Sequence, residues 1–149
     1  MRNVLILAAV VLAASTASAD TAVAGVYNVK YEDVSNNCPS PLKYPNGTMQ
    51  VKSSKGAAIT IDIDRTPIMS GSTSKGGKVS ARSKLGDTSL QGMKGTFSVA
   101  GKITPEGLMS LVMVGEYQAN GKALCTQTWN VNGVKSDDAP AAQTTPKKK

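Results

Sequence analysis

The sequence predicts a single all-β domain of about eight antiparallel strands, an up-and-down barrel or a sandwich, closed by one disulfide. Three observations support this prediction. Short runs of alternating apolar and polar residues are separated by Gly- and Ser-rich turns through most of the chain. No stretch keeps a helical period over more than two turns. The connections between consecutive strands are short, which favours the meander of a barrel over the long crossings of a sandwich.

The N-terminus has the pattern of a secretory signal peptide over residues 1–19. Arg2 precedes an apolar run over 4–14, and Ala17–Ala19 forms a small-residue cleavage site before Asp20. The apolar run is much shorter than the roughly 20 residues of a membrane-spanning helix, and no later segment is apolar enough to span. We therefore expect an exported protein, periplasmic or extracellular, without a transmembrane segment in the mature chain.

The C-terminus differs in composition from the rest of the chain. Residues 136–149 are rich in Ala, Pro and Thr and end in Lys147–Lys149. A segment of this kind has too few apolar residues to bury and is predicted to be a disordered basic tail. The β domain is therefore expected to span 20–135.

The chain contains two cysteines, Cys38 and Cys125. An even count in an exported protein makes one disulfide the default expectation, with a single connectivity. The bond would tie the loop after the first strand to the middle of the last strand. The chain has no CxxC spacing and no His, so a redox pair or a metal site is disfavoured, and no cofactor is expected.

Alternation places the strands in order along the chain. The expected strands before the last two are 25–32, 48–53, 57–64, 66–73, 78–84 and 95–103. Their inward-facing residues are predicted to be Tyr27, Val29, Tyr31, Met49, Val51, Ile59, Ile61, Ile63, Val79, Ala81, Phe97 and Val99. Pro67 opens the fourth strand, which places it at an edge or across a bend. Residues 33–45 are predicted as a loop, and residues 85–93 as a loop or one short turn.

Residues 107–133 predict two long strands joined at Asn120-Gly121, a dipeptide typical of tight hairpin turns. Regular pairing outward from this turn sets Glu116 opposite Cys125 and Val112 opposite Trp129. One face then carries the Trp and the half-cystine, and we assign it to the core. Its members are Val112, Val114, Cys125, Trp129 and Val131.

The opposite face of this hairpin is more apolar than a solvated face should be. It carries Met109, Leu111, Met113, Tyr117 and Leu124. Either another part of the chain covers this face, or it is a contact surface. These five residues and Trp129 are the candidate contacts with a ligand or partner.

The architecture resembles that of small exported barrels such as the lipocalins and avidins. Gly25-Val26-Tyr27 stands near the start of the first strand, where lipocalins carry Gly-x-Trp, and Tyr replaces the Trp. No other lipocalin motif is present. The resemblance implies a barrel and says little about function, because one fold serves many functions.

Enzymatic chemistry is not expected. Without His the chain lacks an imidazole base and a Ser-His-Asp triad, and we assign no catalytic residue. Asp62 and Asp64 beside Arg65 form the densest charged cluster. A Ca²⁺ site needs six to eight oxygen ligands, so this cluster is interpreted as a solvated strand face with a local ion pair.

Three functions remain as hypotheses, of which an enzyme is the least favoured because no nucleophile, base and orienting group can be assembled. The net charge of +7 is explained by solubility, and one Trp, one Phe and four Tyr are too few for a nucleic-acid stacking platform. The first hypothesis is binding of a small apolar ligand or lipid by the barrel. It is favoured by the flexible methionines Met49, Met69, Met93, Met109 and Met113. The second is contact with a protein partner or an anionic envelope polymer through the final hairpin and the basic tail.

Overall fold

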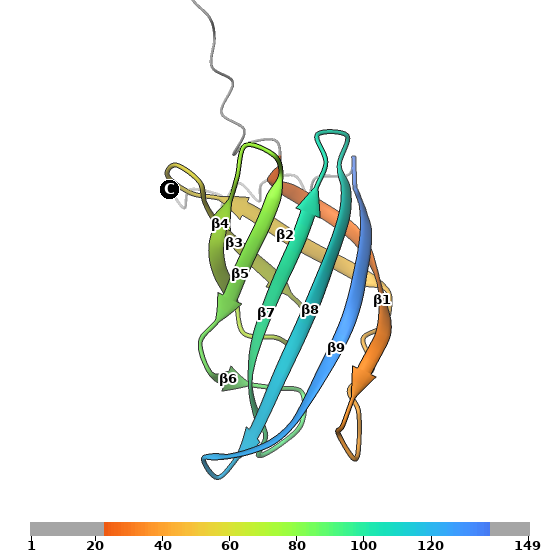
Figure 1. Ribbon diagram of the computed structural model, residues 1–149, viewed down its shortest axis with the longest axis vertical. Helices are drawn as coiled ribbons and strands as arrows, with labels where there is room; N and C mark the ends of the chain where they lie inside the picture. The colour runs from red at the N-terminus through yellow and green to blue at the C-terminus, as the bar shows by residue number, and fades with distance from the viewer. Residues whose placement is uncertain (1–22, 138–149) are drawn as a thin grey trace, which may run out of the picture.

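The computed structural model describes residues 23–137, which form one antiparallel sheet of nine strands (Figure 1). The strands are β1 (Gly25–Asn36), β2 (Gly47–Ser53), β3 (Ala58–Ile63), β4 (Met69–Thr73), β5 (Lys78–Ser83), β6 (Gly86–Asp87), β7 (Lys94–Ile103), β8 (Leu108–Ala119) and β9 (Lys122–Lys135). The predicted signal peptide and the tail beyond Asp137 lie outside the described residues. Within 23–137, no helix has the length and apolar character needed to cross a membrane.

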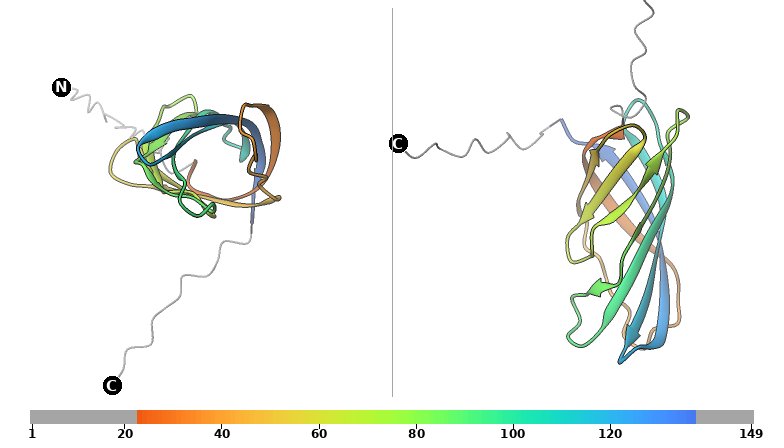
Figure 2. Two further views of the ribbon diagram at one scale, coloured as in Figure 1. Left: turned by 90° about the horizontal axis from the view of Figure 1, so that it is seen from below. Right: turned by 90° about the vertical axis from the view of Figure 1, so that its left-hand side faces the viewer.

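The sheet closes in a ring. Neighbours in sequence pair from β1 to β5, β5 pairs with β7, and β7, β8 and β9 follow in order. The ring is completed by β9, which pairs with β1. Seen from below, the strands surround a central space (Figure 2). The two-residue β6 is a short addition to the lower end of β7. The predicted all-β class and the meander order of antiparallel strands are confirmed.

Apolar side chains fill the inside of the ring. Tyr27, Met49, Ile61 and Phe97 are fully buried, and Trp129 is only 1% exposed. All but one of the twelve inward residues predicted for the first strands are buried, and the exception, Tyr31, is half-buried and packs against the core. Alternation identifies these residues because a closed sheet buries one face of every strand.

The predicted turn of the last hairpin is confirmed. Asn120 and Gly121 have φ values of 50° and 72°, as a type I′ turn requires, and Ala119 pairs with Lys122. The predicted pairing beyond the turn is wrong. A β-bulge lies between the pairs Gln118–Ala123 and Tyr117–Cys125, and it leaves Leu124 on β9 without a partner on β8.

This bulge reverses the face assignment of β8. Met113, not Val112, lies opposite Trp129. The face of β8 predicted as a contact surface is the inner face, and its members are buried: Met109, Leu111, Met113 and Tyr117. Val112, which was assigned to the core, is 44% exposed, and Val114 is half-buried. Of the two alternatives for this apolar face, cover by another part of the chain is therefore correct, and an exposed contact surface is not.

Other details also differ from the prediction. β4 pairs with both β3 and β5, so it is not an edge strand, and Pro67 lies in the bend before it. β1 continues to Asn36, four residues beyond its predicted end. β6 lies inside the segment predicted as the loop 85–93.

The register of the final hairpin gives a matched pair of predictions on one strand. Met113→Ala should destabilise the protein by about 2–4 kcal/mol, because Met113 is fully buried opposite Trp129. Val112→Ala should cost less than about 1 kcal/mol, because Val112 faces outward. Urea denaturation of both variants measures the difference. A larger loss of stability for Val112→Ala than for Met113→Ala would contradict this register and indicate the regular pairing without a bulge.

Candidate functional site

The loop 37–46, between β1 and β2, lies at the lower end of the ring in Figure 1. β1 and β2 pair only as far as Val29 and Gly47, and β1 then runs on alone beside β9. The chain turns back after Asn36, and Cys38 is joined to Cys125 on β9. The predicted disulfide is confirmed. It holds the start of this loop against the last strand.

Gln127 on β9 holds the middle of the same loop. Its side chain is fully buried. Nε2 donates to the carbonyl oxygen of Leu42 at 2.9 Å and to Oδ1 of Asp33 at 2.8 Å, while Oε1 accepts from the amide of Leu42 at 3.0 Å. The amide group therefore satisfies both backbone groups of Leu42, as a neighbouring strand would. Removal of this side chain would leave those groups without their partners.

Tyr44 attaches the end of the loop to the core. Its ring lies edge-on against Trp129, with centroids 5.1 Å apart, and tilted against Tyr31 at 5.2 Å. Burial raises the pKa of Tyr44 to about 12, although the Tyr117 hydroxyl and the charge of Arg65 act in the opposite direction. Burial also raises the pKa of Tyr31 and of Tyr117. These phenols stay protonated at neutral pH.

The hydroxyl oxygens of Tyr44 and Tyr117 are both buried, and each group influences the pKa of the other. Neither makes a hydrogen bond of good geometry with a described residue. The ring of Tyr117 lies back over Gly115, where an added methyl group would be 2.9 Å from the hydroxyl oxygen. The Tyr117 ring can therefore occupy this position only because residue 115 has no side chain.

An apolar hollow of about 220 Å³ lies next to the disulfide at this end, and we call it the end hollow. Three segments meet there: the loop 37–46, the segment 88–93, and the turn end of the β8–β9 hairpin. Its walls are formed by Cys38, Pro39, Ser40, Leu42, Leu90, Met93, Tyr117, Leu124 and Cys125. None of these side chains carries a charge at neutral pH.

The segment 88–93 is shaped by its backbone and by one hydroxyl. Oγ1 of Thr88 donates to the carbonyl oxygen of Met93 at 2.8 Å and accepts from the amide of Leu90 at 3.2 Å. The amide of Met93 donates to the carbonyl oxygen of Leu90 at 3.1 Å. The side chains of Leu90 and Met93 are not needed for this turn and are left to line the hollow.

The structure separates the six predicted contact residues. Tyr117 and Leu124 line the end hollow, and Leu124 is 52% exposed because of the bulge. The other four are buried on the inner face: Trp129, Met109, Leu111 and Met113. They do not form an outer strip, so the hairpin surface proposed from the sequence is corrected.

The sequence does not bring three other wall residues together as a site, although Met93 is one of the methionines named above as favouring an apolar ligand. Leu42, Leu90 and Met93 are single apolar residues in segments that the sequence predicts as loops. Such residues, isolated among Pro, Ser and Gly, are the signal that could have indicated them, because a loop that packs on a core needs an apolar anchor. Within residues 23–137, no group of three His, Cys, Asp or Glu residues is placed to hold a metal.

Comparison of the chain with protein-family models, curated proteins and solved structures finds no match. The resemblance to lipocalins and avidins therefore has no support from these comparisons. The function has to be argued from the geometry of the site.

Proposed function

We propose that the protein is an exported, non-enzymatic barrel that binds a small apolar ligand in the end hollow. The observation that supports this proposal is a concave, uncharged wall of apolar side chains at the one end of the ring where β1 and β2 part. The disulfide is consistent with export, since such bonds persist in oxidising compartments.

The volume limits the ligand. A cavity of about 150 Å³ is large enough for benzene, whereas drug-sized molecules occupy roughly 300–1,000 Å³. The end hollow, at about 220 Å³, fits one aromatic ring or the end of an acyl chain. A whole lipid would have to leave most of its length outside.

The test uses toluene as the probe and the methionine methyl groups as reporters. With ¹³C-methyl-labelled protein, toluene should shift the Met93 signal and leave Met49 unchanged, because Met93 lines the hollow and Met49 is buried elsewhere. Leu90→Asp should weaken toluene binding at least tenfold, because the ligand would have to desolvate a carboxylate. The fold should persist, since the turn 88–93 depends on Thr88 and backbone bonds.

Leu85→Asp is the matched control. Leu85 lies a few residues earlier, is 47% exposed, and is not part of the wall. It should bind toluene with unchanged affinity. Equal loss in both variants, or a Met93 signal that does not respond to saturating toluene, would contradict the proposal.

A second candidate function is contact with an envelope component through the outside of the final hairpin. Leu108 and Val134 are paired neighbours there and are 54% and 55% exposed. These are different residues from the ones that the sequence indicated, although the hairpin is the same. A Met93 signal unmoved by toluene would favour this candidate.

A further inference from the structure

A second hollow opens on the side of the barrel, where β1 and β2 separate. We call it the side groove. It has a volume of about 330 Å³ and lies just beyond the last β1–β2 pair, Val29 with Gly47. It shares no wall residue with the end hollow. Its size is within the range of small-molecule binding sites.

Two tyrosines give the side groove a rigid aromatic wall. Tyr31 and Tyr44 are both half-buried, and their ring centroids are 5.2 Å apart. Tyr44 is in turn fixed edge-on against the buried Trp129. Rings held in this way lose little entropy when a ligand stacks on them.

Polar groups of both kinds surround these rings. Asn46 and Thr48 line the groove from the start of β2, and Asp64 and Arg65 line it from the turn between β3 and β4. Asp64 can only accept hydrogen bonds, Arg65 can only donate them, and the amide and hydroxyl groups do both.

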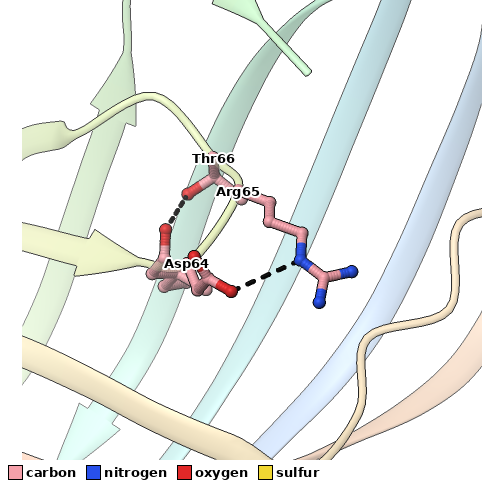
Figure 3. A network of polar contacts seen from close by, with 4 residues as sticks. Asp64, Arg65 and Thr66 are labelled. Atoms are coloured by element: carbon pink, nitrogen blue, oxygen red, sulfur yellow. Dashed lines mark hydrogen bonds and ion pairs between the residues drawn. The ribbon is translucent and has the colours of Figure 1, made fainter. Parts of the chain in front are cut away.

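Arg65 occupies a backbone position that does not suit it. Its φ is 64°, the left-handed region in which Gly or Asn is less costly. The turn is fixed by Thr66, whose Oγ1 and backbone amide both donate to the carbonyl oxygen of Ile63, at 3.1 and 3.2 Å. Figure 3 shows Nε of Arg65 directed at the Asp64 carboxylate, 3.3 Å away, and the other two guanidinium nitrogens turned away from it. Those two nitrogens make no hydrogen bond with a residue in 23–137.

The charges of the side groove favour a neutral ligand. Asp64 and Arg65 are its only charged wall residues, and they form a pair of opposite sign. A sugar ring has an apolar face of C–H groups that stacks on aromatic rings, and hydroxyls that both donate and accept at its edge. We propose that the side groove binds a neutral saccharide, stacked on Tyr31 and Tyr44 and hydrogen-bonded at its edge by Asn46, Asp64 and Arg65.

The test uses maltotriose, cellotriose and triacetylchitotriose as probes, each at millimolar concentration. Binding is followed by amide NMR shifts at Gly47 and Thr48 and by fluorescence of Trp129, the only Trp. At least one probe should shift these signals. Arg65→Asn should weaken that binding about tenfold by removing two charged donors. It should also raise the urea midpoint, because Asn suits the left-handed position.

Arg82→Gln is the matched control, because Arg82 is also exposed and paired with a carboxylate, that of Glu116, on another part of the surface. It should leave saccharide binding unchanged. Three results would overturn the proposal. The first is no signal shift with any of the three probes, and the second is saccharide binding by Arg65→Asn that equals that of the unmodified protein. The third is tighter binding of trigalacturonate than of the neutral saccharides, which would indicate an anion site. Since the two hollows share no residue, toluene binding at Met93 should be the same in both variants.

Discussion

Removal of the disulfide is expected to destabilise the protein by about 2–5 kcal/mol. Cys38 and Cys125 are 87 residues apart, and the chain-entropy model gives roughly 4–5 kcal/mol for a loop of that length. The loss of stability should arise because the unfolded chain gains conformational entropy when the cross-link is removed. The folded loop should change little, because other contacts still hold it. The Asn37 amide still donates to the carbonyl oxygen of Thr126, and Gln127 still bonds Leu42.

The single variants provide the control for this prediction. Cys38→Ala, Cys125→Ala and the double variant should lose about the same free energy of unfolding in urea, since each removes the same cross-link. Two single effects that add up in the double variant would show that the side chains act by packing and not through the bond. A loss below about 1 kcal/mol in all three would contradict the entropic account.

The same variants connect stability to the proposed site. Both cysteines line the end hollow, and the loop that the bond fixes supplies Pro39, Ser40 and Leu42 to its wall. Toluene binding should therefore weaken in the double variant even under conditions where it is fully folded. The wall would persist on average, but its loop would be freer to move.

The strands could be predicted because each one buries a single face. Ile59, Ile61 and Ile63 alternate with polar residues on β3, so the pattern identifies both the strand and its inner side. In β8 the pattern is missing. Val112 and Val114 point outward and Leu111 and Met113 point inward, so both faces are apolar and neither register is preferred. The bulge at Leu124 then decides the pairing, and alternation cannot reveal one extra residue.

The candidate sites were beyond sequence reasoning for a different reason. The end hollow brings together Leu42, Leu90 and Leu124, and the side groove brings Tyr31 near Arg65. Both sites form where loops from distant parts of the chain meet. Periodicity describes which side of one strand is buried and carries no information about which loops meet. The cysteine pair is the one long-range contact that the sequence does indicate.

Substitution of Trp129 by Ala is expected to cost about 3–5 kcal/mol, the range for loss of a large buried ring. Trp129 is 1% exposed, lies opposite Met113, and packs against Tyr44 of the loop 37–46. Its removal would leave a cavity and withdraw the support of that loop. Circular dichroism during urea denaturation measures the loss, since the variant contains no other Trp to follow.

Trp129→Phe separates the structural role of this residue from the contact role proposed from the sequence. Phe keeps a ring against Tyr44, so the variant should lose less stability, about 1–2 kcal/mol. Trp129 is buried and is absent from the wall of the end hollow, so toluene should still shift the Met93 signal. Loss of that shift in a folded Trp129→Phe protein would mean that the ligand enters the core, and that the apolar site extends inward from the hollow to Trp129.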